Sequence, residues 1–281
     1  MAPLDGCYLK IERSLEHLHA LNDARERFIK KEGQLAFRFS GKANSQRTKY
    51  VFRCEEVMND LPLLEWGVFI GDAVHCLRSA LDQMVYTLAT DPTPVCACPL
   101  MTTPKDWAIE APGMLWSVPD EIQAVIEAYQ PYHAGDQAHS HPLALLKALS
   151  NLDKHRGIPI TALSSTEATG SIDRTVGVKS YKKLSFKVGV PLEPDAVIAD
   201  VTIEPDDSGE EPYMHMDAHF TFDVAFGRSP NPSALFLKPV VQAFNQMGAT
   251  ALTFLGAISN VAEPGISRPV ALGAPDRSGP S

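Results

Sequence analysis

The stretch from Gly71 to Tyr86, GDAVHCLRSALDQMVY, decides how we expect this chain to fold. It lies within residues 66–89, a segment with no proline and with no glycine after Gly71. At about 100° per residue, its polar side chains fall on one helix face and its apolar side chains on the other. The polar face carries Asp72, His75, Arg78, Ser79, Asp82 and Tyr86. We predict a helix whose polar face is either a solvated surface or the lining of a site.

The bulk composition limits the kinds of protein that this chain can be. It has 281 residues, 44% of them hydrophobic, which is enough for a sizeable core. A formal net charge of −9 argues against broad electrostatic contact with nucleic acid or an anionic membrane, but not against a small basic site. No long apolar run and no signal peptide is visible, so we expect a cytoplasmic protein with no membrane partner.

The five cysteines are irregularly spaced and odd in number, which argues against a disulfide framework. Cys96 and Cys98 form the only close pair, and no second pair of Cys or His stands nearby. This spacing is weak evidence for zinc, because a structural zinc site needs four ligands. We therefore assign no metal ligand and expect no cofactor.

Helical spacing recurs through the first half of the chain. Three further helices are expected, over residues 6–32, 117–129 and 142–156. Residues 34–39 alternate apolar and polar side chains, and residues 49–53 form a second short strand, so we predict a β-hairpin. Three segments are expected to be loops or irregular: 91–104, 107–116 and 132–141.

The second half has the period of β-strands. Strands are expected over residues 158–163, 176–178, 184–190, 196–203 and 217–226, followed by a helix over 232–259. We predict an α+β fold with a mainly helical part, 1–157, and a β-rich part, 158–261, whose C-terminal helix packs back on the helical part. Residues 262–281 are rich in Pro, Gly and Ser, which is typical of a disordered tail.

A second polar motif interrupts the last helix predicted for the first half. Asp153 and Arg156 fall on its apolar side, and burying a charge is costly unless the charge is paired. Arg78 and Asp82, four residues apart on the central helix, are the natural partners. We predict that Asp153 faces Arg78, and that Arg156 or His155 faces Asp82. Such a network either forms a site or only fixes the register of two helices.

The residues from Leu77 to Gln83, LRSALDQ, resemble the Arg-x4-His helix motif of HEPN domains, with Gln83 standing where that motif has its His. The wider pattern, GDxxHxLRSALD followed by NxDKHR at 151–156, is similar to a group of uncharacterised bacterial proteins. The resemblance covers about residues 64–156. HEPN domains are all-helical domains of bacterial toxins, defence systems and RNases, often dimeric. The resemblance therefore implies RNA and a second copy of the chain as partners.

Metal-independent RNA cleavage needs a group that takes the 2′-hydroxyl proton, an acid for the leaving oxygen and a cation on the phosphate. His75 or His155 would move protons and Arg78 would bind phosphate. The candidate catalytic residues are His75, Arg78, Asp82, Asp153 and His155. The candidate binding residues are Asp72, Ser79, Tyr86, Asn151 and Arg156.

Two alternatives stay open beside RNA processing, and whether the chain is an enzyme at all stays open with them. One is a catalytically silent binding, dimerisation or scaffold protein. The other is a metal site that combines histidine and aspartate side chains of the two motifs. A looser histidine group occurs at His133, His139 and His141. The commonest enzyme classes are excluded, because the chain has no glycine-rich phosphate loop, nucleophile elbow or HExxH zinc motif.

Overall fold

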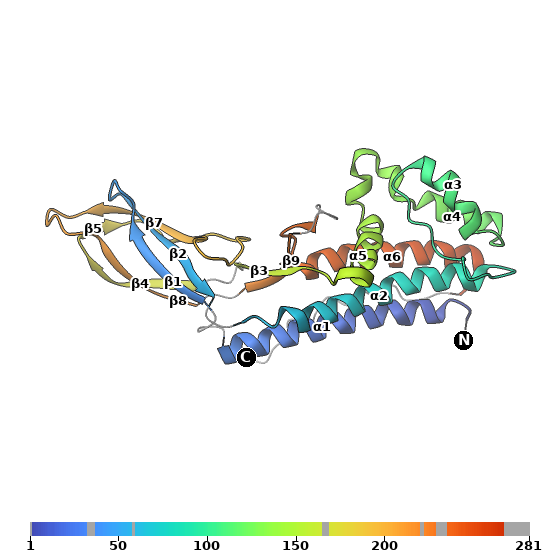
Figure 1. Cartoon of the computed structure of the whole chain (residues 1–281), viewed down its shortest axis with the longest axis horizontal. Helices are drawn as coiled ribbons and strands as arrows, with labels where there is room; N and C mark the ends of the chain where they lie inside the picture. Colours follow the sequence, from blue (N-terminus) through green and yellow to red (C-terminus); the bar gives the residue numbers. More distant parts are fainter. Residues whose placement is uncertain are drawn as a thin grey trace.

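The molecule is elongated, with a bundle of helices at one end and β-strands at the other (Figure 1). This computed structural model describes residues 2–32, 37–57, 60–164, 169–219, 222–228 and 235–266. The α+β fold is confirmed, with N-terminal helices, antiparallel sheets and a long C-terminal helix. Within the described residues, no helix is both long enough and apolar enough to span a membrane.

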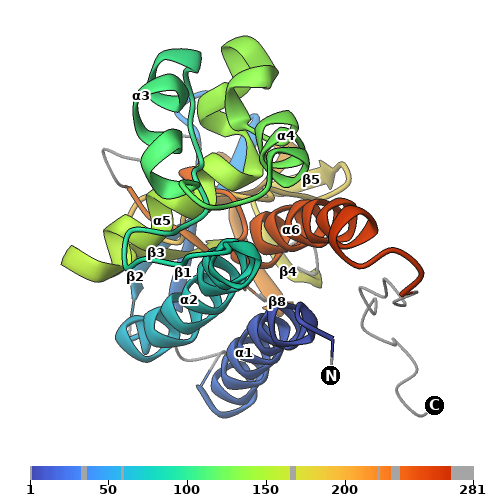
Figure 2. The ribbon, with the colours of Figure 1, turned by 90° about the vertical axis from the view of Figure 1, so that its right-hand side faces the viewer.

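Four helices build the bundle: α1 (Asp5–Glu32), α2 (Leu63–Leu88), α5 (Pro142–Arg156) and α6 (Val240–Ala262). The chain runs in opposite directions along α1 and α2, which lie side by side (Figures 1 and 2). The apolar face that the sequence predicts for α2 is buried, including Trp66, Ile70, Leu77 and Met84. The period of 3.6 residues thus places one face of α2 in the core and leaves its polar face accessible.

The C-terminal helix α6 packs against α1, α2, α5 and the short helix α4 (Asp120–Ala128). The rings of Tyr129 and Phe254 stack with their centroids 4.9 Å apart. Directly after the last residue of α6, the Glu263 carboxylate accepts a hydrogen bond of 3.2 Å from the backbone N–H of Leu4. The end of α6 is therefore fixed to the beginning of α1. The tail predicted from residue 262 is described only as far as residue 266, and residues 267–281 lie outside the described part.

Two predictions of irregular structure are wrong. Residues 107–116 mostly belong to helix α3 (Pro104–Met114), and the expected loop 132–141 mostly forms the 3-10 segment η1 (Pro131–Ser140). The Thr103 hydroxyl accepts a hydrogen bond of 3.1 Å from the Asp106 N–H and so caps α3. This N-cap, with proline in the first turn, starts a helix that continues past its internal Pro112.

The long C-terminal helix begins later than the sequence predicts. Its first residue is Val240, directly after Pro239, whereas residue 232 was the expected start. Residues 229–234 lie outside the described part of the chain. A proline favours the first positions of a helix, because it lacks the N–H that the interior requires.

Antiparallel strands make up the other end of the molecule. The largest sheet has the order β1-β2-β7-β5, with β6 also paired to β7. Its strands are β1 (Phe37–Ala43), β2 (Lys49–Val57), β7 (Val197–Pro205), β5 (Val178–Tyr181) and β6 (Ser185–Phe186). The predicted hairpin is β1-β2, although its expected first residues, 34–36, are outside the described part. Because β2 pairs with β7, strands from both halves of the chain share one sheet.

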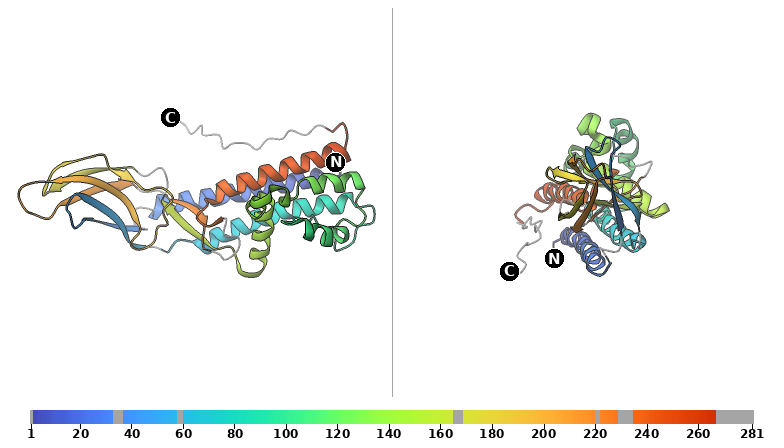
Figure 3. Two further views of the ribbon diagram at one scale, coloured as in Figure 1. Left: turned by 90° about the horizontal axis from the view of Figure 1, so that it is seen from above. Right: turned by 90° about the vertical axis from the view of Figure 1, so that its left-hand side faces the viewer.

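Two ribbons complete the β-rich part, one of β3 (Ile160–Ser164) with β9 (Phe222–Phe226) and one of β4 (Thr169–Val176) with β8 (Tyr213–His219). The strand expected over 217–226 is thus two strands, and residues 220–221 are not described. Figure 3 shows the large sheet extending beyond the end of the bundle, with β3 and β9 between the two.

An aromatic cluster joins the two ends of the molecule. The buried ring of Phe222 in β9 lies 5.9 Å from Trp66 of α2, 6.2 Å from Phe28 of α1 and 5.7 Å from Phe37 of β1, between ring centroids. These rings meet mostly edge-to-face or tilted, the arrangements that aromatic pairs favour. The bundle and the strands therefore share one continuous hydrophobic core.

Acidification is expected to destabilise the large sheet through Asp200. Its carboxylate lies 3.0 Å from Lys49 Nζ and 2.8 Å from Lys187 Nζ. Burial acts to raise the pKa of Asp200, but its hydrogen bonds to the two ammonium groups outweigh burial and hold that pKa below its usual range. A lowered carboxyl pKa stabilises the fold above the unfolded value of about 4, and this stabilisation is lost as pH falls through the folded value. Melting temperatures recorded from about pH 6 down to about pH 2 measure the loss.

Asp200→Asn is expected to remove this part of the acid response, so the variant loses less stability on acidification than the parent chain. Asp91→Asn, at an exposed acid outside the sheet, serves as the control and should keep the full response. If Asp200→Asn and the parent lose equal stability on acidification, the ion pairs of Asp200 are not the cause.

Candidate functional site: an open cationic cleft

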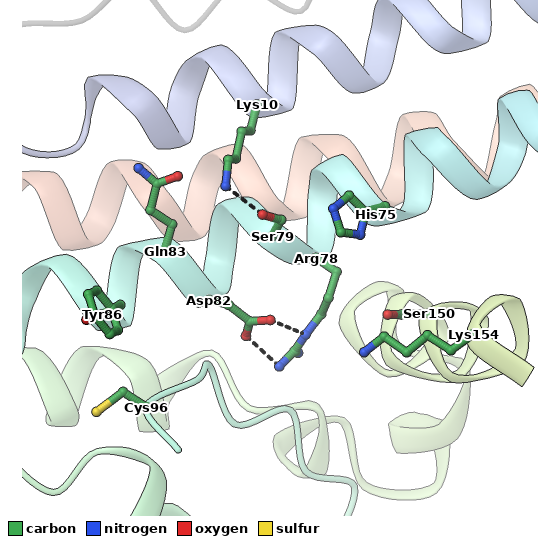
Figure 4. A pocket seen from close by; sticks show the side chains of 10 residues that line it. All are labelled: Lys10, His75, Arg78, Ser79, Asp82, Gln83, Tyr86, Cys96, Ser150 and Lys154. Atoms are coloured by element: carbon green, nitrogen blue, oxygen red, sulfur yellow. Dashed lines mark hydrogen bonds and ion pairs between the residues drawn. The ribbon is translucent and has the colours of Figure 1, made fainter. Parts of the chain in front are cut away.

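The polar face of α2 lines an open cleft of about 480 Å³ between α1, α5 and the loop that follows α2. Ten side chains line it: Lys10, His75, Arg78, Ser79, Asp82, Gln83, Tyr86, Cys96, Ser150 and Lys154. Six of them come from α2 at successive turns, as Figure 4 shows. The predicted polar face is therefore the floor of the cleft.

The centre of the cleft is the pair Arg78 and Asp82, one helical turn apart. Arg78 donates to the Asp82 carboxylate through Nε at 3.1 Å and Nη2 at 2.6 Å, which is a bidentate ion pair. The same Nη2 donates to the Cys98 carbonyl at 2.8 Å, and the Cys98 N–H donates to Asp82 Oδ1 at 2.9 Å. The pair thus binds both backbone polar groups of Cys98 and fixes the loop against α2.

Three cations reach the cleft, and only Arg78 has a carboxylate partner among the described residues. Lys10 of α1 donates to the Ser79 hydroxyl at 2.6 Å, and Lys154 extends from α5 toward Arg78 (Figure 4). The buried Nη1 of Arg78 has no hydrogen-bond partner in the described part of the chain. With Asp82 as the single carboxylate of the lining, the cleft is cationic in a chain of net charge −9.

The predicted pairing of Asp153 with Arg78 is wrong. Asp153 lies over Gly71, where an added Cβ would stand 2.6 Å from the Asp153 carboxylate oxygen. Gly71 is seven residues before Arg78, or about 10 Å along the helix axis. The absent side chain at Gly71 lets α5 approach α2 at that turn, and this contact point sets which residues of α5 face the cleft. Those residues are Ser150 and Lys154.

The other predicted residues divide into those that line the cleft and those that do not. His75, Ser79 and Tyr86 line it together with Arg78 and Asp82. Asn151, His155 and Arg156 are exposed on α5 outside this lining, so neither His155 nor Arg156 faces Asp82. Asp72 turns toward α1, with its carboxylate 3.8 Å from Nδ1 of His17. The α2 motif therefore contributes most of its predicted residues. The α5 motif contributes none of its predicted residues, but its Lys154 lines the cleft.

Five lining residues were not among the candidates from the sequence: Lys10, Gln83, Cys96, Ser150 and Lys154. Ser150 and Lys154 are four apart on α5, a spacing that could have indicated a shared face. Lys10 gives no such signal, because it lies on a separate helix far along the chain. Gln83, which the helical wheel puts at the margin of the polar stripe, also belongs to the lining.

The described residues contain no group of three or more His, Cys, Asp or Glu side chains that could hold a metal ion. Burial raises the pKa of the Cys98 thiol to about 12, and a protonated thiol is a poor metal ligand. His141 instead caps α5, with its Nδ1 3.3 Å from the Leu143 N–H. These observations give no support to the metal-site alternative.

Comparison of the chain with protein-family models, with curated proteins and with solved structures finds no match. The class of site therefore follows from its geometry: an open cleft in an α+β protein, lined by three cations and a single carboxylate, with one histidine and an exposed tyrosine.

Proposed function

We propose that the cleft binds the phosphates of RNA, as part of a HEPN-like protein of RNA processing or defence. The observation that carries this proposal is the gathering of Lys10, Arg78 and Lys154 around a single, already paired carboxylate. Three cations beside one carboxylate leave an excess of positive charge, and an anion placed between them would relieve their mutual repulsion. Phosphate is a fitting anion, because lysine and arginine are the side chains that commonly bind it.

His75 gives the cleft an imidazole, the side chain that most often serves as a general base. It lines the cleft beside Arg78 and is exposed, so a bound nucleotide could reach it. In the proposed reaction His75 takes the proton of the 2′-hydroxyl, whose oxygen then attacks the adjacent phosphorus. The bond from phosphorus to the 5′ oxygen breaks, and that oxygen takes a proton from solvent. A 2′,3′-cyclic phosphate and a 5′-hydroxyl end result, and no metal takes part.

A second candidate is an RNA-binding or self-associating scaffold without catalysis. Gln83 favours it, because glutamine does not exchange protons near neutral pH and stands where the HEPN motif has its histidine. Arg78 favours it as well, since its hydrogen bonds to Asp82 and to the Cys98 carbonyl hold the loop after α2 in place. An RNA-binding scaffold would share the phosphate-binding cleft with the first candidate and differ from it only in what His75 does, whereas a self-associating scaffold would not need the cleft to bind RNA.

Binding is tested by Lys154→Met, which keeps the aliphatic stem and removes the charge. We expect its affinity for single-stranded RNA to fall about threefold to tenfold, and the slope of log affinity against log salt to fall by about 0.7. Lys105→Met on α3 removes an exposed lysine outside the cleft and should change neither value. Fluorescence anisotropy over a range of salt concentrations gives both quantities. Equal binding by both variants and the parent chain would refute a phosphate site in the cleft.

Cleavage is tested with labelled RNA in the presence of EDTA, using the parent chain and His75→Ala. Products ending in a cyclic phosphate, formed by the parent and lost in His75→Ala, support catalysis. RNA that is bound but never cut supports the scaffold. His17→Ala is the matched control, because His17 lies on α1 outside the lining and its loss should leave cleavage unchanged.

A further inference from the structure

Tyr86 presents an aromatic ring to one end of the cleft. Its side chain is 51% exposed, although it belongs to a helix whose other face is buried. In the described part of the chain its ring stacks on no other ring and its hydroxyl forms no hydrogen bond. Figure 4 places Tyr86 at the opposite end of the cleft from His75 and Lys154. An accessible aromatic ring beside a cationic groove is the combination on which unpaired nucleobases stack.

Gln83 lies one turn before Tyr86, with its side chain directed toward α1 (Figure 4). Its amide lies against Gly6, where an added Cβ would stand 2.8 Å from Nε2. The Gln83 amide forms no hydrogen bond to any described residue, so its N–H donors and its carbonyl acceptor are available. An amide that both donates and accepts matches the edge of a nucleobase, which presents donors and acceptors side by side.

We propose that Tyr86 and Gln83 form a nucleobase subsite at the end of the phosphate-binding cleft. This inference rests on the proposed function, and it makes these two residues the determinants of base preference. The base stacks on the Tyr86 ring, and Gln83 hydrogen-bonds to its edge. The adjoining phosphate lies between Lys10, Arg78 and Lys154. The base has to be unpaired, because a paired base offers its face to its neighbours in the stack.

The test compares two probes that carry the same phosphates. One is a fluorescein-labelled single strand of uridines about ten nucleotides long, and the other is a strand of equal length made of abasic ribose phosphates. Tyr86→Ala is expected to weaken binding of the uridine strand about tenfold and to leave binding of the abasic strand unchanged. Tyr86→Phe should keep the affinity of the parent chain, since the ring is retained. Tyr181→Ala, at a tyrosine that is also 51% exposed but lies in β5, is the matched control and should change neither affinity.

Gln83 is tested by Gln83→Met, which is similar in length but has no amide. Binding is measured for four single strands, each made of only one of the four bases. The ratio of the highest to the lowest of these affinities is expected to move toward one in Gln83→Met, while the affinity for the abasic strand stays constant. The subsite is refuted if Tyr86→Ala weakens both probes equally or neither, or if Gln83→Met leaves the ratio as it was. These results would leave phosphate binding intact. Failure of the parent chain to bind either strand would instead refute the proposed function, and this inference with it.

Discussion

Trp66→Ala is expected to lower the free energy of unfolding by about 3–5 kcal/mol, the range for truncation of a buried tryptophan. Trp66 is completely buried, and its ring centroid lies 5.8 Å from that of Phe28 and 5.9 Å from that of Phe222. The substitution removes the ring that α2 contributes to the aromatic cluster joining α1, α2 and β9. Small domains are stable by about 5–15 kcal/mol in total, so the variant should unfold at a much lower urea concentration. Urea titration followed by circular dichroism measures the change.

Two controls separate the loss of packing from other effects. Trp66→Phe should cost less than about 1.5 kcal/mol, because it keeps an aromatic ring and removes an indole N–H that is buried without a described partner. Trp116→Ala removes a tryptophan that is 63% exposed and should change stability by no more than about 0.5 kcal/mol. Equal destabilisation by Trp66→Ala and Trp116→Ala would contradict the central place of this cluster in the core.

Asp82→Ala is expected to cost about 2–3 kcal/mol of stability. It leaves the guanidinium of Arg78, whose side chain is 14% exposed, without its carboxylate, and it leaves the Cys98 N–H without its acceptor. Breaking a buried pair by removing one partner typically costs about 3–5 kcal/mol. The expected cost of Asp82→Ala is lower than this range because the Asp82 side chain is 35% exposed, and solvent therefore screens the pair. Urea titration again gives the value.

A double-mutant cycle shows whether this cost belongs to the pair. Arg78→Met combined with Asp82→Ala should cost at least about 1 kcal/mol less than the sum of the two single substitutions, because neither partner is then left uncompensated. Asp72→Ala, at an exposed acid of the same helix, should stay within about 0.5 kcal/mol of the parent chain. Additive single effects would mean that Arg78 and Asp82 stabilise the fold independently.

Interactions between residues close in sequence are predictable from the sequence, and those between distant residues are not. The pairing of Arg78 with Asp82 is a contact between residues four apart on one helix, and this spacing alone predicts it. The helix α3 was missed because its N-cap at Thr103 outweighs an internal proline, a balance that periodicity does not measure. The prediction that Asp153 faces Arg78 is wrong because two helices can pack at several turns, and each turn offers different side chains.

The sequence by itself determined helices α1, α2, α4 and α5, the hairpin and the two faces of α2, because these depend on the local period of apolar residues. It also determined that polar groups from Asp72 to Tyr86 would follow one another along a single face. Only the tertiary structure decided that this face is a cationic cleft. The crossing of α5 over Gly71 brings Lys154 to the cleft and turns Asp153 away, and the packing of α1 adds Lys10. Contacts between distant segments depend on which side chains leave room for one another, and that is settled only when the whole core packs.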